Sequence, residues 1–401
     1  MTKQEIIKTA FKVWGREQYQ STSLVQLARE LGVSKSALYR HFKNKQALLE
    51  AMYESFFDEY AAFIKPEYDK AVAAQDIVES FFIMIRIMVE YYIRHRDMFI
   101  FSLVRLYGDY DMGSMTRRLL SRGIDLRYFL RVEKDALAYP SLIQLIIGHL
   151  SFVICYFHRP DQTSEALGSD RAVDEMLSFM KENISFGLGL DKALIDALDY
   201  QRLEALCPGR NCETCNDESI LKAVAGAVAE AGPWEASMDM IARRSGLSKS
   251  GLYSHFKSKQ DMLKQLFMTE FDRILEYIEE GIALSAVPEE QLYLAVFSAA
   301  DYFRTRSEIL LAADWIRTRR LNLGITLPPR LYQVFSYINL KVPGTQQAVF
   351  TPAVVDRLGQ MILFLIVHTF MHRPEGMSLS ELPNNGIRRL FRFIVLGMKG
   401  F

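Results

Sequence analysis

Hydrophobic residues recur at helical spacing along most of the chain. The first apolar stripe predicts a helix from about Lys3 to Arg16 and consists of Ile6, Ile7, Ala10, Phe11 and Trp14. Similar stripes predict helices over Lys45–Lys65, Val78–Tyr92, Met98–Tyr107, Leu119–Val132, Ser141–Phe157, Val173–Leu190, Lys259–Ile278, Leu292–Phe303, Ile309–Arg320, Ala353–Met371 and Ile387–Met398. The pattern therefore predicts an all-α protein.

One mixed polar and apolar stretch occurs twice. Val33 to Leu49, VSKSALYRHFKNKQALL, returns as Leu247 to Leu263, LSKSGLYSHFKSKQDML, at an offset of 214 residues without a gap. Each copy opens with a serine, Ser34 or Ser248, whose oxygen can cap a helix by accepting from its first-turn amides. Leucine and phenylalanine four positions apart then share one face, while polar residues occupy the other. Each copy predicts a short capped helix with a hydrogen-bonding outer face.

A second helix is predicted immediately before each copy. In the first, Leu24, Leu27, Ala28 and Leu31 lie at helical spacing, and Gly32 can adopt the left-handed conformation that ends a helix sharply. The corresponding residues of the second copy are Met238, Ile241, Ala242 and Gly246. A helix, a glycine turn and a capped helix form a helix-turn-helix, whose second helix enters the major groove of DNA.

These two segments resemble the amino-terminal signature of the tetracycline-repressor (TetR) family of transcriptional regulators. In that signature an aromatic residue, a phenylalanine and a lysine follow the glycine turn in this order. The matching residues are Ala28, Gly32, Val33, Ser34, Tyr39, Phe42 and Lys45, and again Ala242, Gly246, Leu247, Ser248, Tyr253, Phe256 and Lys259. The resemblance implies a DNA-binding regulator, and the alternative is a helical interaction protein that does not bind DNA.

The predicted DNA-binding residues follow from the helix-turn-helix geometry and from the resemblance. We expect Lys45 and Lys259, at helix starts, to hold phosphates. The resemblance implies that Thr22 caps the second helix and meets a phosphate; the second copy has alanine there, and Ser237 beside it is expected to take over the cap. The residues expected to face the groove are Lys35, Ser36, Ala37, Tyr39, Arg40 and His41, and Lys249, Ser250, Gly251, Tyr253, Ser254 and His255.

The two predicted reading heads are not identical. Arg40 is replaced by Ser254, and Ala37 by Gly251. Arginine can bond guanine with two hydrogen bonds, which serine cannot do. We therefore expect an imperfect palindromic operator, with its stricter half under the amino-terminal head.

The duplication extends beyond the helix-turn-helix segments. His158-Arg-Pro and His372-Arg-Pro follow the two long apolar helices at the same offset of 214 residues. We predict helix-turn-helix domains at residues 1–48 and 218–262, helical regulatory and dimerisation domains at 49–200 and 263–401, and a cysteine-rich linker at 201–217. In TetR-like proteins the last two helices form a dimer interface, so one chain is expected to form an intramolecular pseudo-dimer, with further association of two chains left open.

The resemblance also implies a ligand cavity in each helical body. Met, Phe and Tyr are frequent in Phe81 to Tyr110 and in Tyr293 to Trp315, which suits a small apolar or aromatic ligand. Tyr92-Ile-Arg-His-Arg96 recurs as Tyr302-Phe-Arg-Thr-Arg306. We interpret these arginines as solvated helix ends, and the alternative is a site for an anionic ligand.

Charge and composition narrow the function further. The formal net charge is +0, but Leu24 to Gln46 and Met238 to Gln260 each carry about +4, which places a basic patch on each head. No phosphate-binding glycine loop, zinc-protease pair or nucleophile elbow occurs, so we expect no enzyme. The amino terminus does not have the pattern of a secretion signal, and the apolar runs are shorter than the ~20 residues of a membrane span, so we expect a cytoplasmic protein. His149 and His368 lie in these apolar runs and are expected to be core residues.

Three of the four cysteines fall between the two copies. Cys207, Cys212 and Cys215 have Cys-x4-Cys-x2-Cys spacing, which also occurs at iron–sulfur clusters and which could serve zinc. The fourth cysteine, Cys155, is predicted to lie in an apolar helix away from them. A metal-sensing or redox-sensing regulator, a thiol switch and a plain exposed linker remain the alternatives for this segment.

Overall fold

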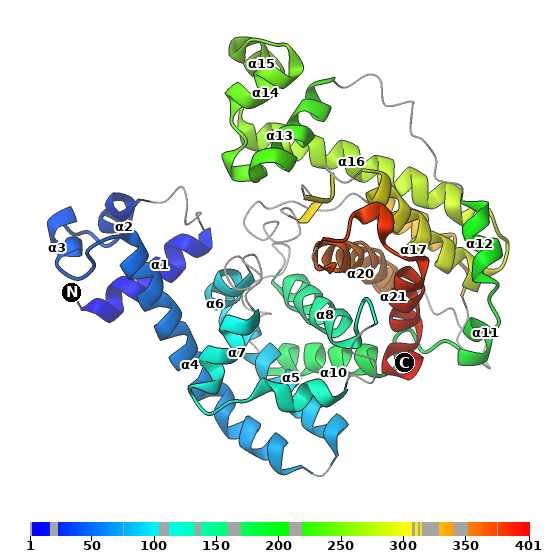
Figure 1. The fold of residues 1–401 in the computed structure, drawn as a ribbon, viewed down its shortest axis with the longest axis horizontal. Helices are drawn as coiled ribbons and strands as arrows, with labels where there is room; N and C mark the ends of the chain where they lie inside the picture. The colour runs from blue at the N-terminus through cyan, green and yellow to red at the C-terminus, as the bar shows by residue number, and fades with distance from the viewer. Residues whose placement is uncertain are drawn as a thin grey trace. The chain divides into compact units, whose positions relative to one another are not determined.

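The computed structural model describes residues 2–16, 23–74, 76–103, 112–132, 138–158, 170–207, 219–306, 309–311, 313–314, 329–340, 352–374 and 376–401. Within these ranges the secondary structure is helical and contains no strand (Figure 1). The described helices include none with the length and hydropathy of a membrane span. The chain divides into two compact units: residues 1–134 with 153–179, and residues 135–152 with 180–401.

The first unit begins with a helix-turn-helix. Its helices are α1 (Lys3–Arg16), α2 (Leu24–Glu30), α3 (Lys35–Tyr39), α4 (Lys45–Ala73), α5 (Ile77–Arg94), α6 (Arg96–Phe101), α7 (Met112–Leu120) and the 3-10 helix η2 (Leu126–Val132), followed by the end of α8 (Leu142–Phe157) and the start of α10 (Asp170–Phe186). The predicted helix over Lys3 to Arg16 is therefore confirmed, as are those over α5 and α8. α1 packs against α2, α4 and α6, which makes it the strut between the helix-turn-helix and the helical body.

Aromatic side chains fill the core between α4 and α5. Tyr60 stacks on Phe56 with ring centroids 5.4 Å apart, and its ring meets that of Tyr91 at 4.8 Å. All three side chains are fully buried. The hydroxyl of Tyr91 donates a 3.1 Å hydrogen bond to Glu59, which lets its polar end remain in this apolar layer.

The second unit repeats this order of elements. Its helices are the first part of α8, the end of α10, α11 (Lys192–Asp196), α12 (Tyr200–Leu206), α13 (Ser219–Glu235), α14 (Met238–Ser245), α15 (Lys249–His255), α16 (Lys259–Ile282), α17 (Pro288–Thr305), α19 (Arg330–Ser336), α20 (Pro352–Met371) and α21 (Asn384–Leu396), with the 3-10 helices η3 (Leu379–Glu381) and η4 (Gly397–Gly400). α13 to α17 correspond to α1 to α5 of the first unit. The tandem all-α architecture predicted from the repeat is confirmed.

α17 is the central helix of the second unit. Every residue from Leu292 to Phe303 is buried, because α12, α16, α20 and α21 all pack against this helix. Gly281 of α16 lies close against α17, since a Cβ there would clash with the Ser298 hydroxyl oxygen of α17. A larger residue at this position would force the two helices apart.

Helices from both sequence copies share the core of the second unit. α8 belongs to the first copy, and its residues up to Phe152 lie in this unit with α20 and α21 of the second copy (Figure 1). Gln144 of α8 donates a 3.0 Å hydrogen bond to the carbonyl of His372, just beyond α20. Arg389 of α21 donates another, also 3.0 Å, to the carbonyl of Pro140. These bonds join the closing helices of the two copies within one polypeptide.

The predicted core histidines lie at this contact. His149 of α8 and His368 of α20 are both buried. Burial lowers the pKa of His149 to about 4, so its imidazole is neutral at neutral pH. Gly148 is required beside it, because a Cβ at this position would lie 2.7 Å from Cδ2 of His368. The prediction that these histidines are core residues is confirmed.

Two predicted helix spans are wrong. α4 does not end at Lys65 but continues through Pro66 to Ala73, and ion pairs of Lys65 with Asp69 and of Lys70 with Glu67 lie along the added turns. The helix predicted over residues 119–132 is broken, because Gly123 adopts a φ of 77° between α7 and η2.

The prediction that the arginines at the end of α17 are solvated is wrong. Arg304 donates hydrogen bonds of 2.7 Å to Asn384 and 2.6 Å to the carbonyl of Leu382. Arg306 pairs at 3.2 Å with Glu270, whose side chain is 5% exposed. Both guanidinium groups are structural, because each satisfies buried acceptors of the second unit.

One carboxylate of the segment joining the two copies accepts four hydrogen bonds from the rest of the second unit. Glu204 of α12 accepts hydrogen bonds of 2.7 and 2.8 Å from Arg388, and others from Tyr293 (2.6 Å) and Asn384 (2.8 Å). Burial would raise the pKa of Glu204, but these donors outweigh it and hold the pKa below the ordinary value of 4.5. The ionised form is therefore the one that stabilises this contact.

We predict that Glu204→Gln lowers the free energy of unfolding by about 2 kcal/mol at pH 7, because Arg388 loses its charged partner. Since the pKa is lowered on folding, this stabilisation is complete above pH 4.5 and is lost as the pH falls through the folded-state pKa. Chemical unfolding of both proteins at pH 7 and below pH 4 measures the difference. The control is Glu175→Gln, which removes only an exposed pair with Arg171. Equal effects of the two substitutions, or a difference that persists in acid, would contradict this prediction.

Candidate nucleic-acid interface

The two helix-turn-helix segments share a glycine turn and the backbone hydrogen bond that closes it. In the first, Gly32 has a φ of 65° and the amide of Val33 donates to the carbonyl of Ala28 at 2.9 Å. In the second, Gly246 has a φ of 71° and the amide of Leu247 donates to Ala242 at 3.1 Å. A left-handed residue is needed at this position of each turn, and glycine adopts that conformation without strain.

Serine caps begin both second helices, as predicted. The hydroxyl oxygen of Ser34 accepts from the amide of Ala37 at 3.2 Å, and that of Ser248 accepts from Gly251 at 3.0 Å. The side chains of Leu38 and Leu252 are fully buried beneath these helices. The caps and the buried leucines thus fix which face of each helix points outward.

The first helices of the two motifs are also capped by serine. Ser23 caps α2, and its hydroxyl oxygen accepts from the amide of Gln26 at 3.2 Å. In turn the side-chain oxygen of Gln26 accepts from the amide of Ser23 at 2.7 Å. Ser237 caps α14 and accepts from Met240, as predicted. The cap expected at Thr22 lies one residue later, because Ser23 has the extended backbone of an N-cap; Thr22 itself lies outside the described residues.

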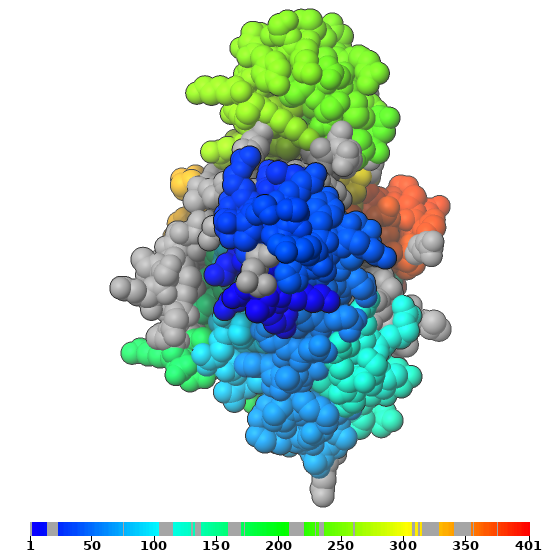
Figure 2. All heavy atoms as spheres, turned by 90° about the vertical axis from the view of Figure 1, so that its left-hand side faces the viewer, coloured from blue at the N-terminus to red at the C-terminus, as the bar shows by residue number. Residues whose placement is uncertain are grey.

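The predicted groove-facing side chains lie together on the outer face of each motif. Tyr39 is 42% exposed and Tyr253 is 50% exposed, although their neighbours Leu38 and Leu252 are buried. Figure 2 looks onto the side of the molecule that carries the first motif, drawn in blue. The exposed members of the predicted set are Lys35, Ser36, Tyr39, Arg40 and His41, and Lys249, Ser250, Tyr253, Ser254 and His255; Ala37 and Gly251 are half-buried.

The second helices of the two motifs differ in length. α3 ends at Tyr39, so that Arg40 and His41 follow it, with Arg40 as the C-cap residue in right-handed helical conformation. The counterparts Ser254 and His255 still lie within α15. The first of these helices therefore ends two residues earlier than the second. The difference leaves Arg40 on a short terminal turn.

Lys45 and Lys259 begin α4 and α16, as predicted. Asn44 caps the first of these helices by accepting from the amide of Ala47 at 2.8 Å, and Ser258 caps the second by accepting from Asp261 at 3.1 Å. Both lysines are half-buried at a helix amino terminus, where the helix dipole is positive. This is a place where a phosphate group is stabilised.

Charge is distributed differently on the two heads. Lys249 of the second head pairs at 3.1 Å with Asp239, whereas Lys35 of the first head lies 5.5 Å from the centroid of the Tyr39 ring. Position 25, the counterpart of Asp239, is valine. The second head therefore holds its lysine in an internal ion pair that DNA would have to replace. An acidic residue ten positions before the lysine was the signal in the sequence for this pair.

The hydroxyl of Ser254 is also engaged within its own helix. It donates a 2.6 Å hydrogen bond to the carbonyl of Gly251. Arg244 pairs with Glu230 on α13, which further reduces the unmatched positive charge of the second head. In consequence the first head presents a long arginine where the second presents a short, internally bonded serine.

Only one of the clustered cysteines lies within the described residues. Cys207 follows α12, is half-buried, and has its sulfur 3.8 Å from the Ser298 hydroxyl. Cys212 and Cys215 lie outside the described ranges, and Cys155 is buried in α8. Among the residues that the structure describes, no group of three His, Cys, Asp or Glu side chains is placed to hold a metal ion. The metal or iron–sulfur site stays a prediction.

Comparison with known proteins identifies the two motifs. The family model described as "Bacterial regulatory proteins, tetR family" matches residues 6–52 and again residues 220–266. The chain is 31% identical over 77 residues to the "Fatty acid metabolism regulator protein" of Bacillus subtilis (strain 168), which covers 19% of the chain and 40% of that protein. It is 43% identical over 47 residues to the "Uncharacterized HTH-type transcriptional regulator YerO" of the same organism, covering 12% of the chain and 16% of that protein.

A solved structure of the same family is also similar. The TetR family transcriptional regulator PfmR from Thermus thermophilus is 20% identical, with a TM-score of 0.28, over 44% of this chain and 95% of that one. The chain spans less than half the length of the two curated relatives named above. The double match of the family model is what decides the assignment: the chain carries the amino-terminal domain of the TetR family of regulators twice.

Proposed function

We propose that this protein is a ligand-responsive transcriptional repressor that binds one operator with two non-identical heads. The observation that supports the proposal most strongly is the presence of two capped helix-turn-helix motifs with matching turns on one chain. Each motif has a buried inner face and a hydrogen-bonding outer face. α3 and α15 are the helices that would enter two successive major grooves.

The proposed docking assigns different tasks to the side chains of each head. Tyr39, Arg40 and their counterparts reach base edges, and the lysines at the starts of α4 and α16 contact phosphates. Phosphate contacts set the position of a head on the duplex, whereas base contacts select the sequence. The internally paired Lys249 and the internally bonded Ser254 make the second head the less selective of the two.

We further propose that one chain acts as a pseudo-dimer. The contacts of α8 with α20 and α21 support this, because they join the closing helices of both copies in one core. A homodimer has identical heads and favours a palindrome, whereas two fused heads can diverge independently. The preferred operator is therefore an imperfect palindrome.

The signal is proposed to be a small apolar or aromatic molecule bound in a helical body. The Met, Phe and Tyr content of residues 81–110 and 293–315 supports an apolar site. The name of one relative, which refers to fatty acid metabolism, fits an apolar signal of this kind. Residues 104–110, 307, 308, 312 and 315 of these segments lie outside the described ranges.

We predict that Lys45→Ala weakens binding to all DNA sequences alike and reduces the slope of log K against log salt by about one unit. Lys259→Ala should have a similar effect at the other half-site. Fluorescence anisotropy with the chain's own upstream region, at several salt concentrations, measures both slopes. Lys264→Ala, on α16 beyond the cap, serves as a charge-matched control. Unchanged slopes in both variants would show that these helix starts do not hold phosphates.

We also predict that exchanging the divergent pair changes sequence preference. Arg40→Ser should relax one half of the operator by about 1–3 kcal/mol at the base pair it contacts, because a bidentate contact is lost. Ser254→Arg should create a new preference in the other half. Binding to operators with systematic base changes tests both substitutions. Equal tolerance in the two halves of the wild-type operator would refute the assignment of the stricter half to the amino-terminal head.

A further inference from the structure

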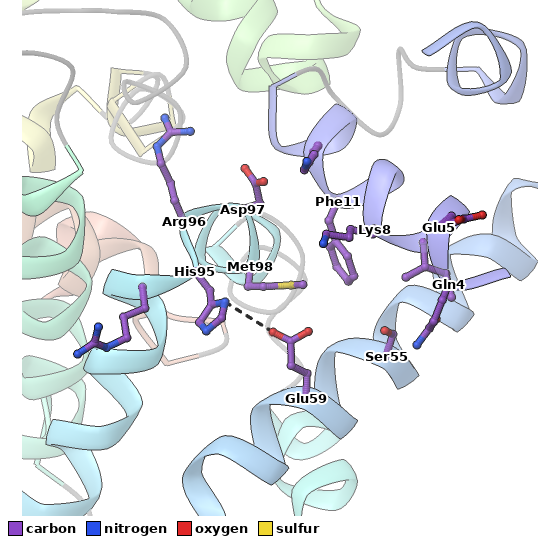
Figure 3. Close-up of a pocket in the computed structure, with 13 residues that line it drawn as sticks. Gln4, Glu5, Lys8, Phe11, Ser55, Glu59, His95, Arg96, Asp97 and Met98 are labelled. Atoms are coloured by element: carbon purple, nitrogen blue, oxygen red, sulfur yellow. Dashed lines mark ion pairs between the residues drawn. The ribbon is translucent and has the colours of Figure 1, made fainter. Parts of the chain in front are cut away.

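A cleft opens in the first unit between its helix-turn-helix and its helical body. α1 forms one side, α4 lies beneath, and the joint between α5 and α6 forms the other side (Figure 3). Its volume is about 690 Å³, within the range of sites for small organic molecules. It lies outside the segments in which an apolar cavity was expected, apart from its wall at residues 94–98.

Charged side chains line both sides of the cleft. Lys8 and Lys12 lie four positions apart on the exposed face of α1. Neither has an ion pair with any residue that the structure describes. Arg96 and Asp97 extend from the opposite side, at the start of α6 (Figure 3). The two lysines are therefore the main source of unmatched charge in the cleft.

Three other ionic groups of the cleft already have hydrogen-bond or ion-pair partners. Glu59 accepts from the hydroxyl of Tyr91 and lies 3.7 Å from Nδ1 of His95, as the dashed line in Figure 3 marks. Arg94 is held by Glu90 at 3.0 Å and by Asp170 at 2.9 Å. The carboxylate of Glu5 accepts from the amide of Thr2 at 2.6 Å, which ties it to the start of α1. The described lining still holds four cationic side chains, Lys8, Lys12, Arg94 and Arg96, against three carboxylates, Glu5, Glu59 and Asp97, so the cleft keeps a small net positive charge.

Apolar side chains lie beside the lysines. Phe11 and Met98 point into the space between α1 and α6 (Figure 3). Phe11 also contacts Phe101 of α6 edge to face, with ring centroids 5.0 Å apart. We infer that this cleft binds a small organic anion, with its carboxylate or phosphate on Lys8 and Lys12 and its apolar part against Met98 and Phe11.

The position of the cleft couples such a ligand to the first head. α1 packs against α2 of the helix-turn-helix and against α6 of the body. An anion held between the α1 lysines and the α5–α6 joint fixes α1 relative to the body and so changes the affinity of that head for DNA. This coupling rests on the proposed function, whereas the binding of the anion does not.

The second copy cannot build the same site. Lys12 and Phe11 correspond to Gly226 and Ala225, and Glu59 corresponds to Arg273. Arg306, the counterpart of Arg96 in the recurring Tyr-x-Arg-x-Arg segment, is paired with Glu270. Of the four side chains proposed to hold the anion, only Lys8 has its counterpart retained, as Lys222. The site therefore belongs to the first head alone, and Lys222→Ala provides a matched control.

Calorimetry on the full chain tests binding. Benzoate and phenyl phosphate are the probes for the two headgroups, with benzyl alcohol as the neutral analogue and inorganic phosphate as the anion without an apolar part. We expect at least one organic anion to bind at millimolar concentration or below and both comparison molecules to bind at least about tenfold more weakly. A Lys8→Ala, Lys12→Ala double variant should weaken binding about tenfold or more, whereas Lys12→Arg and Lys222→Ala should retain it. Absence of binding by both organic anions, or binding unchanged in the double variant, overturns the site.

DNA affinity in the presence of the bound probe tests the coupling. At constant ionic strength, the probe should weaken operator binding about fivefold or more in the wild type and leave the double variant unchanged. A wild type that binds the probe but no DNA refutes the proposed function and leaves the site intact. A wild type that binds DNA and the probe independently refutes the coupling.

Discussion

The close approach of α8 to α20 is the constraint on which the two-copy structure depends. At Gly148 the helices are so near that a single added carbon would lie 2.7 Å from the ring of His368. Around this point, backbone carbonyls at the end of each copy accept hydrogen bonds from side chains of the other. Leu188, after α10, also donates its amide to the carbonyl of Ile394 in α21 at 3.0 Å. Separating the copies would break these bonds and expose a buried apolar surface.

The two copies share their glycine turns and serine caps but differ on the outer faces of their helix-turn-helix motifs. The glycine turns and serine caps set the backbone of each head, so a substitution there would destabilise the helix-turn-helix. A substitution on the outer face of a head does not have this structural effect. The Lys249–Asp239 pair and the Arg40 to Ser254 exchange lie on those faces, and the cleft beside Lys12 has no counterpart in the second copy. Two heads on one chain can therefore acquire different affinities and different regulation.

Local patterns in the sequence were sufficient to predict most of the helices and both motifs. Apolar spacing located α1, α5 and α8, and the glycine and serine positions predicted the turns, because these depend on residues close in sequence. The predictions failed where contacts between residues far apart in the sequence determine the structure. α4 continues through Pro66, and Arg304 and Arg306 are drawn inward by acceptors on other helices. The pairing of Lys249 with Asp239, and the joining of α1 to α6 around a cleft, likewise required the folded chain.

The central claim is that a single chain supplies both heads to one operator. The most direct measurement is the mass of the protein–DNA complex at concentrations where the operator is just saturated, combined with a footprint of the same sample. The account predicts one 46.2 kDa chain per operator, with both half-sites protected together. A complex that needs two chains to protect the two halves of one operator would contradict it.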